Sequence, residues 1–183
     1  MAGTLLIVGA SIFMVGAAVG VPRVFTTPDP QARLRLLEQQ AGRWRIAQPL
    51  YAGGPVITAV GVGIASTDMT DTAAQVMGFI AAVTMLVGAA TWSYSCYLRG
   101  QRPADFALGK LRAWPFTTYV VLTILGLAFL GGAFLADDYP GWLGWLVLIA
   151  DVAFLGIYAA TKDLPPFVFY LLLIFVGVVF VVR

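Results

Sequence analysis

Six long apolar segments restrict what this chain can fold into. They cover residues 4–21, 46–65, 73–98, 114–136, 142–160 and 166–182. Each is close to the roughly 20 residues that an α-helix needs to cross the hydrocarbon core of a bilayer. Their apolar residues run continuously instead of alternating with polar ones, which argues against the strands of a transmembrane barrel. The sequence therefore predicts an all-α integral membrane protein, a single polytopic domain with six transmembrane helices.

The composition supports the same class. Of the 183 residues, 60% are hydrophobic and 11% are charged, whereas a soluble domain usually carries about 25% charged residues. This deficit indicates that lipid surrounds most of the chain. The formal net charge is only +2 and the basic residues form no tail, so we expect no nucleic-acid partner. The excess of arginine over lysine, nine to two, fits a bacterial source.

The charges between the segments predict an orientation. The connections after the first and third segments are rich in basic residues, namely Arg23, Arg33, Arg35, Arg43, Arg45, Arg99, Arg102, Lys110 and Arg112, and the connection after the fifth carries Lys162 and Asp163. The connections after the second and fourth carry only acidic charges, namely Asp68, Asp71, Asp137 and Asp138. Because basic loops stay in the cytoplasm, we expect a multi-pass cell-membrane protein with both termini external. The first segment has no basic stretch before it and is expected to be a retained helix, not a signal peptide.

Missing residue types exclude several kinds of chemistry. The chain has no histidine and a single cysteine, Cys96. These absences exclude histidine-ligated haem or metal, an internal disulfide and a cysteine-ligated cluster. Both lysines fall in predicted loops, and the sequence contains no phosphate-binding loop and no nucleophile elbow. We therefore expect no cofactor, no metal site and no catalytic residues.

The connection between the first two segments predicts a short amphipathic helix in the cytoplasmic interface. Asp29 followed by Pro30 is typical of an N-cap and a first helical turn. Leu34, Leu37, Ala41 and Trp44 then fall on one face, and the charged residues, including Arg43 and Arg45, fall elsewhere. Two roles stay open for such a helix. It is either an anchor that covers the ends of neighbouring helices, or a docking surface or sensor of anionic lipid.

One carboxylate, Asp151, stands at the centre of the fifth apolar segment. A charge at this depth costs about 2.5–3.5 kcal/mol on insertion scales, so such residues normally face protein or water and have a partner. No lysine or arginine lies inside any segment to pair with Asp151. The residue is either a proton or cation site, or a hydrogen-bonding group that joins two helices.

The third segment offers candidate partners for this carboxylate. Thr84, Gly88, Thr91 and Ser95 share one helical face and form a small, polar stripe. Such a stripe serves close helix packing or lines a narrow aqueous path. Tyr94, Tyr119, Tyr158 and Tyr170 are expected as interfacial anchors or as further polar partners.

The second segment contains two prolines on either side of a glycine pair: Pro49, Gly53, Gly54 and Pro55. Proline removes a backbone hydrogen-bond donor and disrupts the preceding turn, so we expect a kink here. In transporters, broken helices of this kind expose backbone groups to a substrate. The alternative is a static kink that accommodates neighbouring helices.

Two functions follow from these observations. The first is a non-catalytic accessory or interaction subunit of a larger membrane assembly, consistent with the missing catalytic residues and the uniformly aliphatic sixth segment. The alternative is a small proton- or cation-coupled transporter or channel that uses Asp151 and works as a homo-oligomer, because six helices are few for a monomeric transporter. A lipid-modifying enzyme is the third candidate and the weakest, because no nucleophile–base pair is visible.

Overall fold

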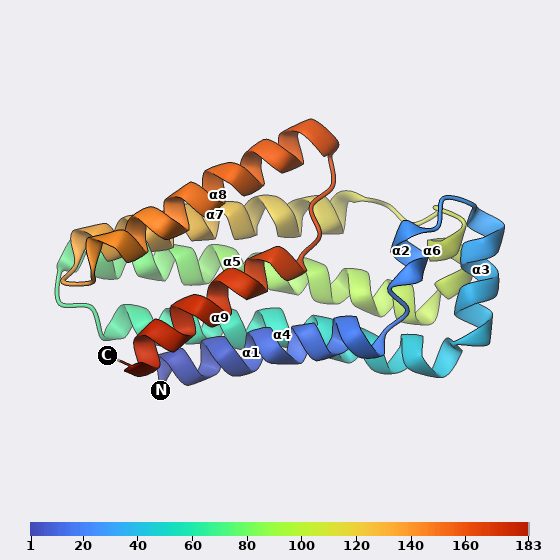
Figure 1. Cartoon of the computed structure of the whole chain (residues 1–183), viewed down its shortest axis with the longest axis horizontal. Coiled ribbons are helices and arrows are strands. Elements are labelled where there is room, and N and C mark those ends of the chain that lie inside the picture. Colours follow the sequence, from blue (N-terminus) through green and yellow to red (C-terminus); the bar gives the residue numbers. More distant parts are fainter. Residues whose placement is uncertain (183) are drawn as a thin grey trace.

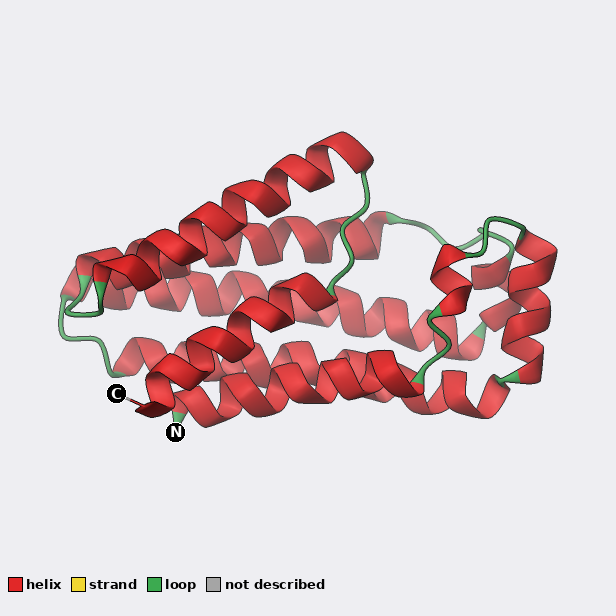
Figure 2. Cartoon of the chain, viewed as in Figure 1, coloured by secondary structure: helices red, strands yellow, loops and turns green. Residues whose placement is uncertain are grey.

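The computed structural model describes residues 1–182, and these form helices joined by short connections, with no strand among them (Figures 1 and 2). The all-helical class predicted from the sequence is therefore confirmed. The helices are α1 (Ala2–Val19), α2 (Arg23–Thr26), α3 (Pro30–Gln39), α4 (Ala41–Thr67), α5 (Thr72–Gln101), α6 (Pro103–Ala107), α7 (Trp114–Ala136), α8 (Gly141–Thr161) and α9 (Phe167–Val182).

Five of these helices, α1, α4, α5, α7 and α8, are long and apolar enough to cross a membrane, which fits a multi-pass membrane protein. The sixth predicted span corresponds to α9, which has 16 residues and falls short of the same length. Six exact spans therefore stay a prediction.

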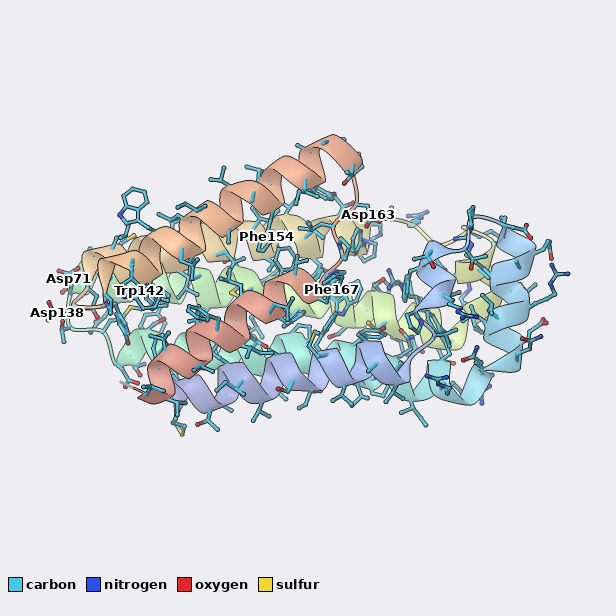
Figure 3. The ribbon with its side chains drawn as sticks, in the orientation of Figure 1. Asp71, Asp138, Trp142, Phe154, Asp163 and Phe167 are labelled. Carbon is cyan, nitrogen blue, oxygen red and sulfur yellow. The ribbon has the colours of Figure 1, made fainter. Side chains whose placement is uncertain are left out.

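The long helices run alternately up and down the bundle. In the order α9, α1, α4, α5, α7, α8, each helix packs against the next. Both termini lie at one end, and α2, α3 and α6 gather at the other (Figure 1). Asp71 and Asp138 lie at the end with the termini (Figure 3). The acidic connections are thus separated from the basic ones by the length of the bundle.

Glycine pairs allow neighbouring helices to approach closely. A Cβ atom added at Gly54 of α4 would lie 2.7 Å from the carbonyl oxygen of Gly9 and 2.8 Å from the Cβ of Phe13, both on α1. Gly3 of α1 and Gly177 of α9 meet in the same way. Lipid tails are as apolar as leucine, so membrane helices associate through close packing of this kind instead of the hydrophobic effect.

The end that carries α2, α3 and α6 has a small core of its own. It is built from Val21, Val24, Leu37, Trp44 and Ala107, with Leu34, Leu36 and Phe106 packed around them. The Trp44 indole N–H donates to the carbonyl of Arg99, at 3.0 Å. The Asp29 carboxylate accepts from the N–H groups of Gln31 and Ala32, as expected of the N-cap of α3.

The predicted amphipathic helix differs from the structure in its extent. The chain breaks at Gln40, so Leu34 and Leu37 lie on α3 whereas Arg43, Trp44 and Arg45 lie on α4. Accordingly α4 begins at Ala41, five residues before the predicted start of the second span at residue 46. The sequence predicts one continuous helix here because Gln39, Gln40 and Ala41 include no proline or glycine that would indicate a break. Whether α3 lies in a membrane interface is untested.

At the opposite end, one carboxylate joins two connections. Oδ1 of Asp137, after α7, accepts from the N–H and the hydroxyl of Thr70 and from the N–H of Asp71, at 2.8–3.0 Å. Partial burial raises the pKa of Asp137, but these hydrogen bonds outweigh it and hold the pKa below its usual value. Asp137 is therefore held as a carboxylate that fixes the turn before α5 to the end of α7.

The glycine contact predicts a difference between two adjacent substitutions. Gly54→Ala should lower the free energy of unfolding by about 1–3 kcal/mol, because the new methyl group would meet the backbone of α1. Gly53→Ala is the matched control, since nothing lies within 4 Å of a Cβ at that position, and alanine there should be neutral or stabilising by up to about 1 kcal/mol. Thermal unfolding of the detergent-solubilised protein measures both. Equal effects would contradict the close α1–α4 crossing.

Candidate functional site

Asp151 lies on the inner side of α8 and is 5% exposed. Its Oδ1 atom is fully buried and has no hydrogen-bond partner. Within residues 1–182, neither oxygen of this carboxyl accepts a hydrogen bond or forms an ion pair. A buried polar group without a partner costs about 1–3 kcal/mol. Residues 1–182 thus offer no hydrogen-bond partner to Asp151, and both roles predicted for its carboxyl group stay predictions.

The register between α7 and α8 determines what lies at the same level as Asp151. A Cβ at Gly144 of α8 would lie 2.9 Å from the carbonyl oxygen of Gly131 on α7, so the two helices cross closely there. Asp151 is two turns beyond Gly144. Two turns back from Gly131 along the antiparallel α7 is Ile124, the neighbour of Thr123.

Thr123 is a second buried polar residue near this level, and it is 3% exposed. Its Oγ1 atom makes no hydrogen bond of good geometry, but the hydroxyl group of Tyr119, one turn earlier on α7, interacts with it. The polar neighbour of Thr123 is therefore Tyr119, whereas Asp151 has none. Buried polar atoms without a partner are rare in folded proteins, and each requires an explanation.

A pair of tyrosines continues the polar groups along α7. Tyr119 lies one turn from Thr123, and its hydroxyl group is 2.7 Å from that of Tyr170 on α9. Both rings are almost fully buried, and Tyr170 stacks on Phe13 of α1 with ring centroids 4.1 Å apart. These two tyrosines are therefore internal polar groups and not interfacial anchors.

Beyond Asp151, α8 separates from the bundle. Its buried residues are Leu143, Gly144, Val147 and Asp151, and none follows in the rest of the helix. Figure 1 shows α8 diverging from α7 toward the C-terminal end of α8. Phe154 extends from α8 toward α9 (Figure 3) and packs edge-on against Phe169, with ring centroids 5.3 Å apart. Asp151 thus lies where the packed half of α8 ends.

The structure does not bring the predicted polar stripe to Asp151. Thr84, Thr91 and Ser95 lie on α5, and α7 packs between α5 and α8. The Thr84 hydroxyl donates to the carbonyls of Ile80 and Ala81 on its own helix, and the Thr91 hydroxyl donates to the carbonyl of Gly88. Thr84 also lies 3.1 Å from where a Cβ of Gly126 on α7 would be. The stripe serves the packing of α5 against α7.

The proline-glycine segment of α4 is a continuous helix through both Pro49 and Pro55. Pro55 has no N–H to donate to the carbonyl of Tyr51, one turn earlier. The indole N–H of Trp92 on α5 donates to that carbonyl instead, at 2.9 Å. The carbonyl of Tyr51 is therefore hydrogen-bonded to another helix of the same protein. Glycine is required at position 54 because a side chain there would meet α1.

The site contains few chemically active groups. Within residues 1–182 no group of three or more histidine, cysteine or acidic side chains is placed to hold a metal ion. One carboxyl and one hydroxyl group can exchange a proton, bind a hydrogen-bond donor or pair with a cation supplied by another molecule. Neither has a base beside it that would make a nucleophile.

Comparison of the chain with family models, with curated proteins and with solved structures finds no match. The function is therefore argued from the geometry of this chain alone.

Replacing Asp151 tests whether its carboxyl group is unsatisfied. Leucine has the same number of side-chain atoms in the same branched shape, so Asp151→Leu should raise the free energy of unfolding by about 1–3 kcal/mol. The control is Asp105→Leu, because Asp105 forms an ion pair with Arg102 at 2.6 Å and its loss should not stabilise the protein. Thermal unfolding in detergent measures both variants. Destabilisation by Asp151→Leu would show that the carboxyl makes a stabilising bond.

Proposed function

We propose that this chain is a non-catalytic interaction subunit of a larger membrane assembly, and that a transmembrane helix of another polypeptide packs against α8. In this proposal the chain crosses the cell membrane six times, with α9 as the sixth span and both termini external. Helix α3 is the cytoplasmic anchor over the helix ends.

The incomplete packing of α8 carries the proposal. In its most apolar 18-residue window 22% of the residues are buried, compared with 39–56% in the other four long helices. The other long helices are packed on two sides, by α9 and α4 in the case of α1 and by α5 and α8 in the case of α7, whereas α8 packs extensively only on α7. A long apolar helix with one main neighbour leaves an open side on which a further membrane helix can pack.

The surface of α8 indicates what kind of partner fits. Its outer side is apolar and highly exposed, with Trp145 at 59%, Ile149 at 66% and Val152 at 68% exposure. Asp151 faces the bundle and is 5% exposed, so it does not belong to this outer surface. We therefore expect a partner helix whose contacting face is apolar along the whole length of this surface.

Charge and direction support the six-span topology. The helices alternate in direction, so that the chain ends where it began (Figure 1). The acidic connections lie at that end and the basic ones at the other, as the positive-inside rule requires of external termini. The 16 residues of α9 extend about 24 Å, somewhat less than the hydrocarbon core of about 30 Å. A mismatch of this size is met by local thinning of the bilayer.

A native pull-down from membranes in mild detergent tests this function. The chain should carry one or more unrelated membrane polypeptides in a fixed ratio. Val152→Trp should reduce this ratio at least severalfold, because the added ring would obstruct a helix packed on α8. Val83→Trp is the matched control, since Val83 of α5 is similarly exposed, at 60%, and does not lie on α8. Purification as an isolated homomer, or equal effects of both variants, would contradict the proposal.

A second candidate function is a small proton- or cation-coupled transporter, working as a homo-oligomer. The observation that favours it is the buried carboxyl group of Asp151, which has no hydrogen-bond partner among residues 1–182. Asp151→Asn should then abolish proton-driven flux in liposomes while the protein stays folded. Asp68→Asn, which removes an exposed carboxylate, should leave the flux unchanged. Flux that persists in Asp151→Asn would exclude the carboxyl as the coupling group.

A further inference from the structure

A cavity of about 320 Å³ opens at the end of the bundle opposite the termini, away from α8. It is lined by Val21, Pro22, Arg23, Gln40 and Arg43. These residues come from the end of α1, the start of α2 and the junction of α3 with α4. Two of the five lining side chains are guanidinium groups, and none is a carboxylate.

One of the two guanidinium groups is held in place. Nε of Arg43 donates to the carbonyl of Val19, at 2.9 Å, and Nη1 donates to Oε1 of Gln40, at 3.1 Å. These two bonds fix the plane of the guanidinium group, and the N–H groups of Nη2 have no partner among residues 1–182. A fixed guanidinium loses little conformational freedom when it binds a ligand, which favours tight binding.

The second guanidinium group, that of Arg23, makes no hydrogen bond or ion pair with any residue between 1 and 182. The nearby first turn of α4 contains no acidic residue, and no side chain caps that helix. A helix N-terminus carries a partial positive charge of about +0.5. Two arginines beside such a terminus, with no carboxylate in the lining, leave an excess of positive charge that an anion would neutralise.

The position of the cavity along the bundle indicates where the anion comes from. It begins beside Val19 and Val21, where the apolar helix α1 ends. If α1 crosses the membrane, this is the level of the lipid headgroups on the basic side. Guanidinium groups bind phosphate oxygens in a bidentate manner, and basic pockets at this level of membrane proteins suit phosphorylated headgroups.

We propose that this cavity binds a phosphate group, with Arg23 and Arg43 as its ligands, and that a phospholipid of the adjacent leaflet supplies it. The site is independent of the α8 interface, because it shares no residue with it.

Binding of a short-chain phosphatidylglycerol to the purified full-length protein in detergent tests the site, with native mass spectrometry to count bound lipids. Arg23→Gln should raise the dissociation constant about tenfold, through loss of charge-assisted hydrogen bonds. Arg35→Gln is the matched control, since Arg35 is an exposed arginine of α3 outside the cavity, and it should change the constant less than twofold. Arg23→Lys keeps the charge and loses the bidentate geometry, so it should give an intermediate loss.

Two further probes separate the possible sources. Diacylglycerol with the same acyl chains lacks the phosphate and should not bind at the site. Inorganic phosphate that binds as tightly as the lipid, with the same dependence on Arg23, would support the phosphate site but assign it to a soluble ligand. Equal losses in Arg23→Gln and Arg35→Gln would indicate attraction by the basic surface as a whole and overturn the proposal. Unchanged binding in both Arg23 variants would overturn it as well.

Discussion

Close approach of helix backbones at glycine is the constraint on which the rest of this structure depends. Gly9 with Gly54, Gly131 with Gly144 and Gly3 with Gly177 each join two antiparallel neighbours. In a bilayer there is no hydrophobic gain from bringing two apolar helices together, so shape and short contacts decide which faces meet. These crossings fix the register of their helices, and the Gly131–Gly144 crossing places Asp151 at about the level of Ile124 on α7.

The helices differ in how completely they are held. The α1, α4, α5 and α7 helices are packed on two sides, whereas α8 has a single close crossing near its beginning. The unsatisfied carboxyl of Asp151 and the loose half of α8 are therefore connected features. If α8 were packed along its whole length, stable folding would require hydrogen-bond donors around the carboxyl group or its replacement by an apolar residue. Because α8 is closely packed only near its beginning, neither is required. Natural proteins tolerate such local violations of packing rules chiefly at functional or strained sites.

The sequence was informative wherever structure follows from local pattern. Continuous apolar runs predicted the long helices, and Asp29 with Pro30 predicted the start of α3. It was uninformative where contacts join distant segments. A single threonine in an apolar helix is ordinary, so the sequence does not single out Thr123, and its neighbourhood to Tyr119 and Tyr170 depends on how distant helices pack. Polarity alone suggests that the stripe on α5 meets Asp151, but the order of the helices places α7 between them.

The bond from Trp92 to the carbonyl of Tyr51 has a mechanical consequence. Pro55 leaves that carbonyl without a donor from its own helix, and the donor comes from α5. If α4 slid or turned against α5, an unsatisfied carbonyl would be exposed in an apolar medium, at a cost of several kcal/mol. The bond therefore opposes sliding or turning of α4 against α5, and the close α1–α4 crossing does the same for α1. Helix α8 has one close crossing near its beginning, so sliding of its later part would break fewer contacts.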